Sequence, residues 1–97
     1  MGREAMSAAE IEAALQDRPG WALEDGKLAR SCRFPDFNAA FGFMTRVALE
    51  AERMNHHPEW RNVWNRVDIE LVTHDAGGIT RLDFELAAHI DALLESN

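Results

Sequence analysis

The sequence has one cysteine, Cys32, and a single thiol can form neither an internal disulfide nor a cysteine-based zinc site. It also has no run of basic residues: 17 acidic and 10 basic side chains give a formal net charge of −7. Such a chain repels a phosphate backbone, so we expect no direct binding to nucleic acid. No apolar run approaches the roughly 18 residues that cross a bilayer, and the N-terminus lacks a signal-peptide core. We therefore expect a soluble cytoplasmic protein without a membrane segment.

The length of the chain indicates a single domain. Its 97 residues are too few for two independent cores, and 46% hydrophobic against 28% charged residues is typical of a globular protein. We predict one domain over residues 1–97, with residues 1–6 as a flexible N-terminus. A domain of this size is marginally stable alone, which favours association into a dimer or a larger assembly.

A short helix and a hairpin are predicted in the first third of the chain. Ser7, followed three residues later by Glu10, forms a capping-box pattern, which predicts a helix over residues 8–17. The pair Asp25-Gly26 lies between two stretches of strand character. It is typical of a type I′ turn, because both central residues of that turn have positive φ.

The longest periodic segment runs from residue 37 to the histidine pair at 56 and 57. Apolar residues recur there at intervals of three and four, which predicts a helix that starts near Asp36 and that Pro58 cannot continue. The predicted inward face of this helix consists of Phe37, Phe41, Met44, Ala48 and Ala51.

A second hairpin and a closing helix follow. The hairpin is predicted to turn near Asn65-Arg66, and Thr80 is a fair N-cap for the helix. The predicted inward residues are Val67, Ile69 and Leu71 in the last strand, and Leu82, Leu86, Ile90 and Leu93 in the helix. The order α-β-β-α-β-β-α predicts an α+β fold, a four-stranded antiparallel sheet with three helices packed on one face.

Polar residues that could carry chemistry gather at the ends of these elements. His56 and His57 end the long helix and His74 ends the last strand, where functional groups commonly collect. Glu52 lies four residues before His56, so we expect its carboxylate to share a helix face with that ring and to fix its tautomer. Asp83 falls in the first turn of the closing helix, where the helix dipole stabilises a carboxylate.

Each of these residues also has an ordinary structural interpretation. Two histidines at a helix C-terminus interact favourably with the dipole, and single acidic residues are commonly surface charges. Trp60 and Trp64 share a strand parity and therefore one face, as core residues or as a platform for a ligand. His89, inside the closing helix, is predicted to be a surface or boundary residue.

Metal binding is an alternative use of the histidines. The side chains of adjacent residues such as His56 and His57 diverge by about 100° on a helix, so they rarely bind one ion. Recognised zinc spacings, such as His-x3-His, are absent. From spacing alone, acid/base chemistry is at least as well supported as a metal site.

Spaced polar residues and two long contiguous runs form a larger pattern. The spaced residues are Glu52, His56, His57, Pro58, Trp64, His74 and Asp83, and the runs are DFNAAFGFMTRVALEAERMNHHPEW and NVWNRVDIELVTH. This pattern resembles the signature of the pterin-4a-carbinolamine dehydratases, and the similarity covers most of the chain from about Trp21 onward. It is far more specific than a histidine pair.

The resemblance implies a fold, an assembly and a reaction. Family members have a four-stranded antiparallel sheet with three helices on one side, and they form dimers or dimers of dimers. They convert 4a-hydroxytetrahydropterin to quinonoid dihydropterin plus water, without a metal or an organic cofactor. This reaction recycles the pterin of aromatic amino-acid hydroxylases.

The resemblance also implies which residues act. The catalytic residues it implies are His56, His57 and His74, and the substrate-binding residues are Glu52, Trp60 and Asp83. Imidazole can give or take a proton at neutral pH, as the expulsion of hydroxide from C4a requires. Our hypothesis is that His56 and His74 are the acid/base pair, with the acid and the base not distinguished. His57 then orients the pterin, and Glu52 sets the state of His56.

One position departs from the family pattern, and one alternative function remains. Asn55 precedes His56 where the mammalian member has Asp, which puts a carboxylate role at that position in doubt.

The alternative is a non-catalytic binding or regulatory module with a protein partner. The mammalian relative is also a dimerisation cofactor of a homeodomain transcription factor, and some degenerate relatives look like assembly chaperones. Retention of three histidines and two acids favours the enzyme.

Overall fold

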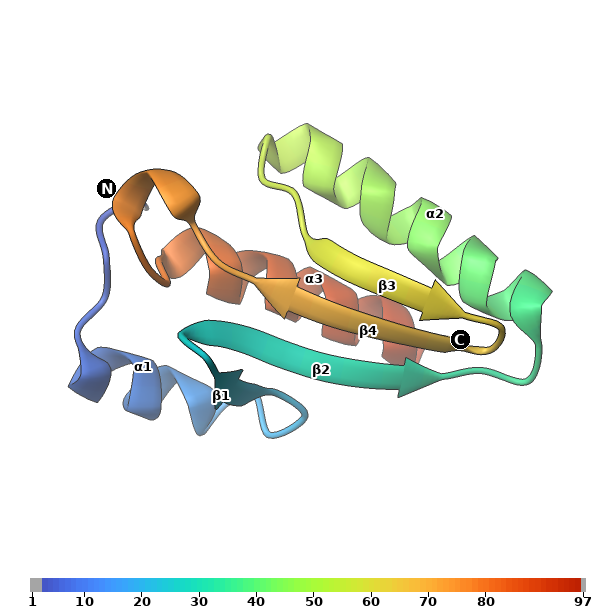
Figure 1. Cartoon of the computed structure of the whole chain (residues 1–97), viewed down its shortest axis with the longest axis horizontal. Helices are drawn as coiled ribbons and strands as arrows, with labels where there is room; N and C mark the ends of the chain where they lie inside the picture. The colour runs from blue at the N-terminus through green and yellow to red at the C-terminus, as the bar shows by residue number, and fades with distance from the viewer. Residues whose placement is uncertain (1–2, 97) are drawn as a thin grey trace.

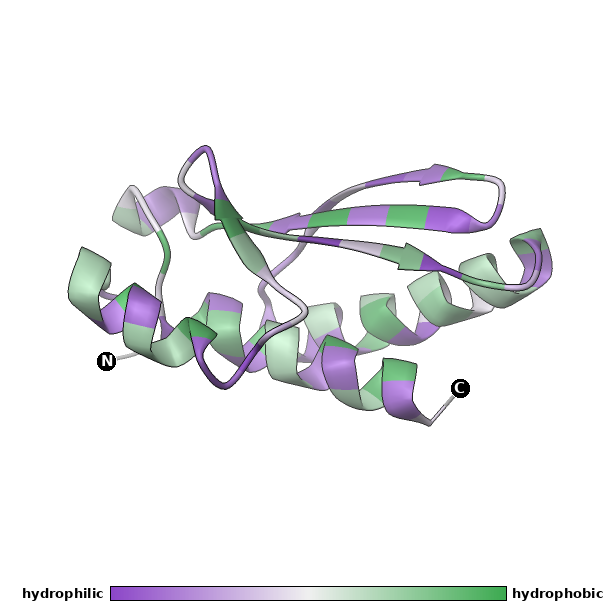
Figure 2. Ribbon diagram, turned by 90° about the horizontal axis from the view of Figure 1, so that it is seen from below, coloured by the Kyte–Doolittle hydropathy of each residue, from purple (hydrophilic) through white to green (hydrophobic). Residues whose placement is uncertain are grey.

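The computed structural model describes residues 3–96, and its elements follow the predicted order (Figure 1). The helices are α1 (Ala8–Leu15), α2 (Phe37–Met54) and α3 (Arg81–Glu95), the strands are β1 (Ala22–Glu24), β2 (Lys27–Arg33), β3 (Glu59–Val63) and β4 (Arg66–Leu71), and a 3₁₀ turn, η1 (His74–Ala76), follows β4. Figure 2 shows the three helices on one face of the sheet. The predicted α+β fold is confirmed.

The sheet joins the two hairpins through their second strands. Its order is β1-β2-β4-β3, and every neighbouring pair is antiparallel. Side chains of β4 alternate as predicted: Val67, Ile69 and Leu71 are buried under the helices, and the residues between them face away. The first residue of β3, Glu59, lies opposite Glu70 on this open face.

The first hairpin turns at the predicted pair, and the second turns close to its predicted pair. Asp25 and Gly26 have φ of 52° and 77°, as a type I′ turn requires. The second turn consists of Trp64 and Asn65, one residue earlier than predicted, because Val63 is already paired with the first residue of β4. Trp64 has φ 50° and is 63% exposed, so the prediction that it shares a strand face with Trp60 is wrong.

Helix α1 begins as predicted and ends two residues early. Ser7 Oγ accepts from the backbone N–H of Glu10, and the Glu10 carboxylate accepts from the backbone N–H of Ser7, which completes the capping box. Ahead of the helix, the backbone N–H of Met6 donates to the carbonyl of Ile79, and Met6 packs against the core. The last residue of the expected flexible N-terminus is therefore tied to the domain, and residues 1–2 lie outside the described part.

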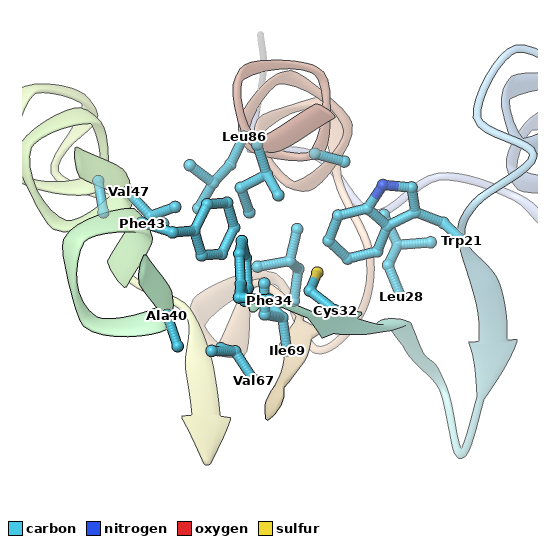
Figure 3. Packing of buried hydrophobic residues seen from close by; sticks show 14 of the residues in the cluster. Trp21, Leu28, Cys32, Phe34, Ala40, Phe43, Val47, Val67, Ile69 and Leu86 are labelled. Atoms are coloured by element: carbon cyan, nitrogen blue, oxygen red, sulfur yellow. The ribbon is translucent and has the colours of Figure 1, made fainter. Parts of the chain in front are cut away.

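The face of α2 that meets the sheet differs from the prediction. Ala40, Phe43 and Val47 belong to the core between the helices and the sheet (Figure 3), and Ala51 continues this stripe. Of the predicted face, Ala51 is buried and Met44 is partly buried, whereas Phe37, Phe41 and Ala48 are exposed. The helix carries two adjacent apolar stripes, and periodicity alone cannot decide which one packs.

Helix α2 ends at Met54 with Asn55 as its C-cap, before the histidine pair and Pro58 are reached. Asn55 has φ 51° and ψ 43°, the left-handed conformation that asparagine adopts more readily than most residues. The backbone N–H of His56 then donates to the carbonyl of Ala51 at 3.0 Å. The difference between asparagine and aspartate at this position therefore falls on a helix cap with an exposed side chain.

A polar cluster at Asp91 ties the first hairpin to α3. Its carboxylate accepts hydrogen bonds from Arg18 (3.0 Å), Arg30 (2.7 Å) and the indole N–H of Trp21 (2.8 Å). This explains the arginine within the apolar face of β2: its guanidinium crosses to α3. A Cβ at Gly20 would collide with that guanidinium, so a larger residue there would displace the end of the Arg30 side chain.

Candidate active site

Most of the polar residues singled out in the sequence meet at one end of the molecule. The C-terminal end of α2, the start of β3, the end of β4 with η1, and the N-terminal end of α3 converge there (Figure 1). His56 follows α2, His74 begins η1, and Asp83 lies in the first turn of α3. Segments separated by up to 27 residues are thus connected through side-chain hydrogen bonds.

His56 and Asp83 form the buried centre of this end. Nε2 of His56 lies 2.6 Å from Oδ1 of Asp83, and the two residues are 6% and 0% exposed. The other carboxylate oxygen accepts from Thr73 Oγ1 at 2.8 Å and from the backbone N–H of Thr80 at 2.9 Å. Both oxygens of Asp83 are therefore satisfied without water.

The hydrogen bond to Asp83 indicates which nitrogen of His56 carries the proton. An ionised carboxylate only accepts, so Nε2–H donates to it, and in the neutral ring Nδ1 carries the lone pair. In residues 3–96, Nδ1 has no hydrogen-bond partner, yet no buried side-chain nitrogen or oxygen there is unsatisfied. We infer that Nδ1 of His56 reaches the surface.

His57 pairs with the carboxylate that was predicted for His56. Nε2 of His57 lies 2.8 Å from Oε1 of Glu52, on the outside of the molecule. The predicted pairing of Glu52 with His56 is wrong, because the left-handed cap at Asn55 takes both histidines off the helical repeat. Asp83, from a different helix, takes that place.

His74 is held by Glu59, a residue that the sequence patterns did not single out. Nε2 of His74 lies 2.6 Å from Oε2 of Glu59, and Oε1 of Glu59 lies 2.6 Å from Nζ of Lys27. The hydrogen bond from Lys27, followed by that from His74, lowers the pKa of Glu59, and Glu59 in turn raises the pKa of Lys27. The register of β3 and β4 could have revealed Glu59. It places Glu59 opposite Glu70, and two facing carboxylates repel each other unless a cation lies near them.

Comparisons with known proteins identify the family of this chain. The model of the family described as Pterin 4 alpha carbinolamine dehydratase matches residues 4–93. The chain belongs to this family. A relative in Solibacter usitatus assigned by name to the same dehydratase is 60% identical over 88 residues, or 91% of this chain and 93% of that one. A relative in Rhizorhabdus wittichii is 55% identical over 98% of this chain and 100% of that one.

A solved structure of the same fold aligns with nearly the whole chain. It is described as a transcriptional coactivator/pterin dehydratase from Brucella melitensis. The TM-score is 0.89 with 43% identity, covering 93% of this chain and 98% of that chain. At this identity and coverage, the two chains share both the fold and the family.

Trp60, Trp64 and His89 of this dehydratase-family chain lie outside the hydrogen-bonded network. Trp60 is half-buried, lies opposite Ile69 and packs against the core, and Trp64 lies in the turn at the far end of β3. His89 is a boundary residue as predicted, near Glu50 on α2. The residues that the sequence patterns did not find are Glu59, Lys27 and Thr73.

An open depression lies beside Glu59, the partner of His74. It has a volume of about 900 Å³ on the uncovered face of the sheet, and its lining includes Glu59 and Trp60 but none of the histidines. His74 lies at its edge, where it bonds to Glu59. Within residues 3–96, no three His, Cys, Asp or Glu side chains are grouped so that they could hold a metal ion. In the same residues, no helix is long and apolar enough to cross a membrane.

Proposed function

We propose that this protein dehydrates a 4a-hydroxytetrahydropterin to the quinonoid dihydropterin and water by histidine acid/base catalysis. In this role it recycles the pterin of aromatic amino-acid hydroxylases. The observation that carries the proposal is the shared anchoring of His56 and His74. A carboxylate is hydrogen-bonded to Nε2 of each ring, and no residue among 3–96 forms a hydrogen bond with Nδ1 of either ring. Membership of the dehydratase family supplies the substrate class.

The reaction needs one proton delivered and one removed. A protonated imidazole gives its Nδ1 proton to the hydroxyl oxygen on C4a, and the C4a–O bond breaks as water leaves. The lone pair of the adjacent ring nitrogen, N5, forms the C4a=N5 double bond, and a second imidazole takes the proton from N5. Proton transfer by a positioned side chain is typically worth about 10²–10⁴-fold in rate.

The assigned roles follow burial and exposure. His56 and His74 are the acid/base pair. His57, whose side chain is 56% exposed and pairs with Glu52, orients the pterin. Asp83 has no exposed surface, so it contributes to the site by orienting His56. The half-buried ring of Trp60 supplies an apolar wall to the pterin.

The direct test is a stopped-flow measurement of the decay of 4a-hydroxytetrahydropterin, with and without the protein. We expect the protein to accelerate the decay and to release the quinonoid dihydropterin. A decay rate that equals the uncatalysed rate at every protein concentration would overturn the proposal.

We propose in addition that the protein is a homodimer or homotetramer. Support comes from the outer stripe of α2, where Phe37, Phe41 and Leu49 are 50%, 54% and 68% exposed. The rings of Phe37 and Phe41 contact each other with centroids 5.7 Å apart, so they form one apolar patch. Burying such a patch against a second copy removes apolar area from water.

A second candidate function is a non-catalytic binding or regulatory module. The observation in its favour is the description of the Brucella melitensis relative as both a transcriptional coactivator and a pterin dehydratase. Dehydration without rate acceleration in the stopped-flow test would favour this module over the enzyme.

A further inference from the structure

Glu59 connects the most exposed histidine of the site to the sheet. We propose that Glu59 is a positioning residue, which holds the ring of His74 in one orientation and one tautomer, and that Lys27 anchors its carboxylate. One oxygen of Glu59 lies 2.6 Å from Nε2 of His74 and the other 2.6 Å from Nζ of Lys27. The proposal rests on the proposed function, because the tautomer matters only if His74 moves a proton.

His74 needs such a residue because little else restrains it. It begins a single 3₁₀ turn, and its side chain is 73% exposed. Among residues 3–96, Glu59 is the one hydrogen-bond partner of its ring. His56, by contrast, is enclosed by the core and by Asp83. An exposed ring with no partner samples several rotamers and both neutral tautomers.

Glu59 is suited to this role because its own position is held from two sides. It is the first residue of β3, in register with Glu70 of β4. Facing carboxylates repel each other, and Lys27 lies between them, 2.6 Å from Glu59 and 4.0 Å from Glu70. The ammonium group of Lys27 keeps the carboxylate of Glu59 ionised and in place. An ionised carboxylate only accepts hydrogen bonds.

An ionised Glu59 determines the chemistry left to His74. Nε2–H donates to Glu59, so Nδ1 is the nitrogen that exchanges a proton with a substrate. Loss of the carboxylate releases the ring into the alternative tautomer, in which Nδ1 carries the hydrogen and cannot act as a base. Binding of the pterin, which uses other residues, is expected to change less than turnover.

The experiment compares four variants of the full chain. Glu59→Ala removes the acceptor, Glu59→Gln keeps an acceptor oxygen without the charge, and Lys27→Met removes the anchor. Glu70→Gln is the matched control, because Glu70 faces Lys27 from the same sheet face but has no contact with His74. Two measurements are made: kcat and KM for the pterin, and the tautomer of His74 from the ¹⁵N chemical shifts of its ring.

We expect Glu59→Ala to lower kcat about ten-fold with KM changed less than two-fold, and to convert His74 from one tautomer to a mixture. Glu59→Gln and Lys27→Met give intermediate effects, and Glu70→Gln resembles the parent. Equal kcat in Glu59→Ala and Glu70→Gln, or an unchanged His74 tautomer in Glu59→Ala, would overturn the proposal. If the parent has no activity, the proposed function fails, and the nitrogen shifts alone decide whether Glu59 holds His74.

Discussion

Nε2 of His56 lies 2.6 Å from Oδ1 of Asp83, although the two residues are 27 positions apart and belong to the ends of different helices. Neither helix could hold its residue in this position alone: Asn55 turns His56 inward at the end of α2, and Thr80 begins α3 so that its first turn carries Asp83. The buried pair then joins Thr73, the residue before His74. The hydrogen bonds of this pair therefore end one residue along the chain from His74, the other histidine of the proposed acid/base pair.

We predict that His56→Ala and His74→Ala each lower the turnover of 4a-hydroxytetrahydropterin ten-fold or more, because each removes one proton carrier. Stopped-flow kinetics measure the effect, and far-ultraviolet circular dichroism checks that the fold remains. His89→Ala is the matched control, because His89 lies outside the network and should retain the parental rate. Turnover at the parental rate in both His56→Ala and His74→Ala would contradict the acid/base assignment.

Asp83 is predicted to support both stability and turnover. Asp83→Ala leaves His56, Thr73 and the N–H of Thr80 without their partner in a buried site, which should lower the free energy of unfolding by about 2–5 kcal/mol. Asp83→Asn keeps the volume and should mainly lower kcat, because an amide holds the ring of His56 less firmly. Urea unfolding and stopped-flow kinetics separate the two effects, with the exposed Asp75→Ala as control. An Asp83→Asn variant with parental kcat would contradict the orienting role.

Asp91 is predicted to stabilise the fold away from the site. Asp91→Ala removes the shared acceptor of Arg18, Arg30 and Trp21, which should lower the free energy of unfolding by about 2–4 kcal/mol. Urea unfolding followed by tryptophan fluorescence measures this loss. Asp17→Ala, an exposed acid nearby, should change the stability by less than about 0.5 kcal/mol. Equal stability of the two variants would show that the Asp91 cluster contributes nothing.

The pairing of Lys27 with Glu59 predicts a pH dependence of stability. The pKa of Glu59 is lowered in the folded protein, first by Lys27 and then by His74, so this stabilisation is complete above the ordinary glutamate pKa and is lost as the pH falls through the lowered value. The pKa of Lys27 is raised, so its part is complete below the ordinary lysine pKa and is lost as the pH rises through the raised value.

The measurement is the urea midpoint of the parent and of Glu59→Gln from acid to alkaline pH. The difference between them should be largest between about pH 5 and 9 and should shrink at lower pH. A difference that stays constant down to about pH 2.5 would mean that the charge of Glu59 does not stabilise the fold.

The exposed stripe of α2 predicts self-association. Phe41→Glu places a charge within the apolar patch and should shift the protein towards the monomer in sedimentation velocity. Ala92→Glu adds the same charge at an exposed position of α3 and should leave the assembly intact. A parent protein that sediments as a monomer at all concentrations would refute the proposed oligomer.

Much of the fold could be predicted because its signals are local. The capping box at Ser7, the N-cap at Thr80, the Asp25-Gly26 turn and the alternation in β4 depend on neighbours within a few residues, and each appears in the structure. The failures concern choices that local patterns leave equal. Either of two apolar stripes on α2 could pack against the sheet. The turn of the second hairpin can likewise be placed one residue later with little change in the composition of either strand.

The sequence by itself determined the element order, the fold class and the position of the three histidines at the ends of elements, because caps, turns and periodicity act over short distances. The tertiary structure decided which carboxylate each histidine meets. The left-handed cap at Asn55 removes His56 from Glu52 and directs it to Asp83, and the register of β3 brings Glu59 to His74. Such contacts join residues 15 and 27 positions apart, and they form only when the core has packed the helices against the sheet.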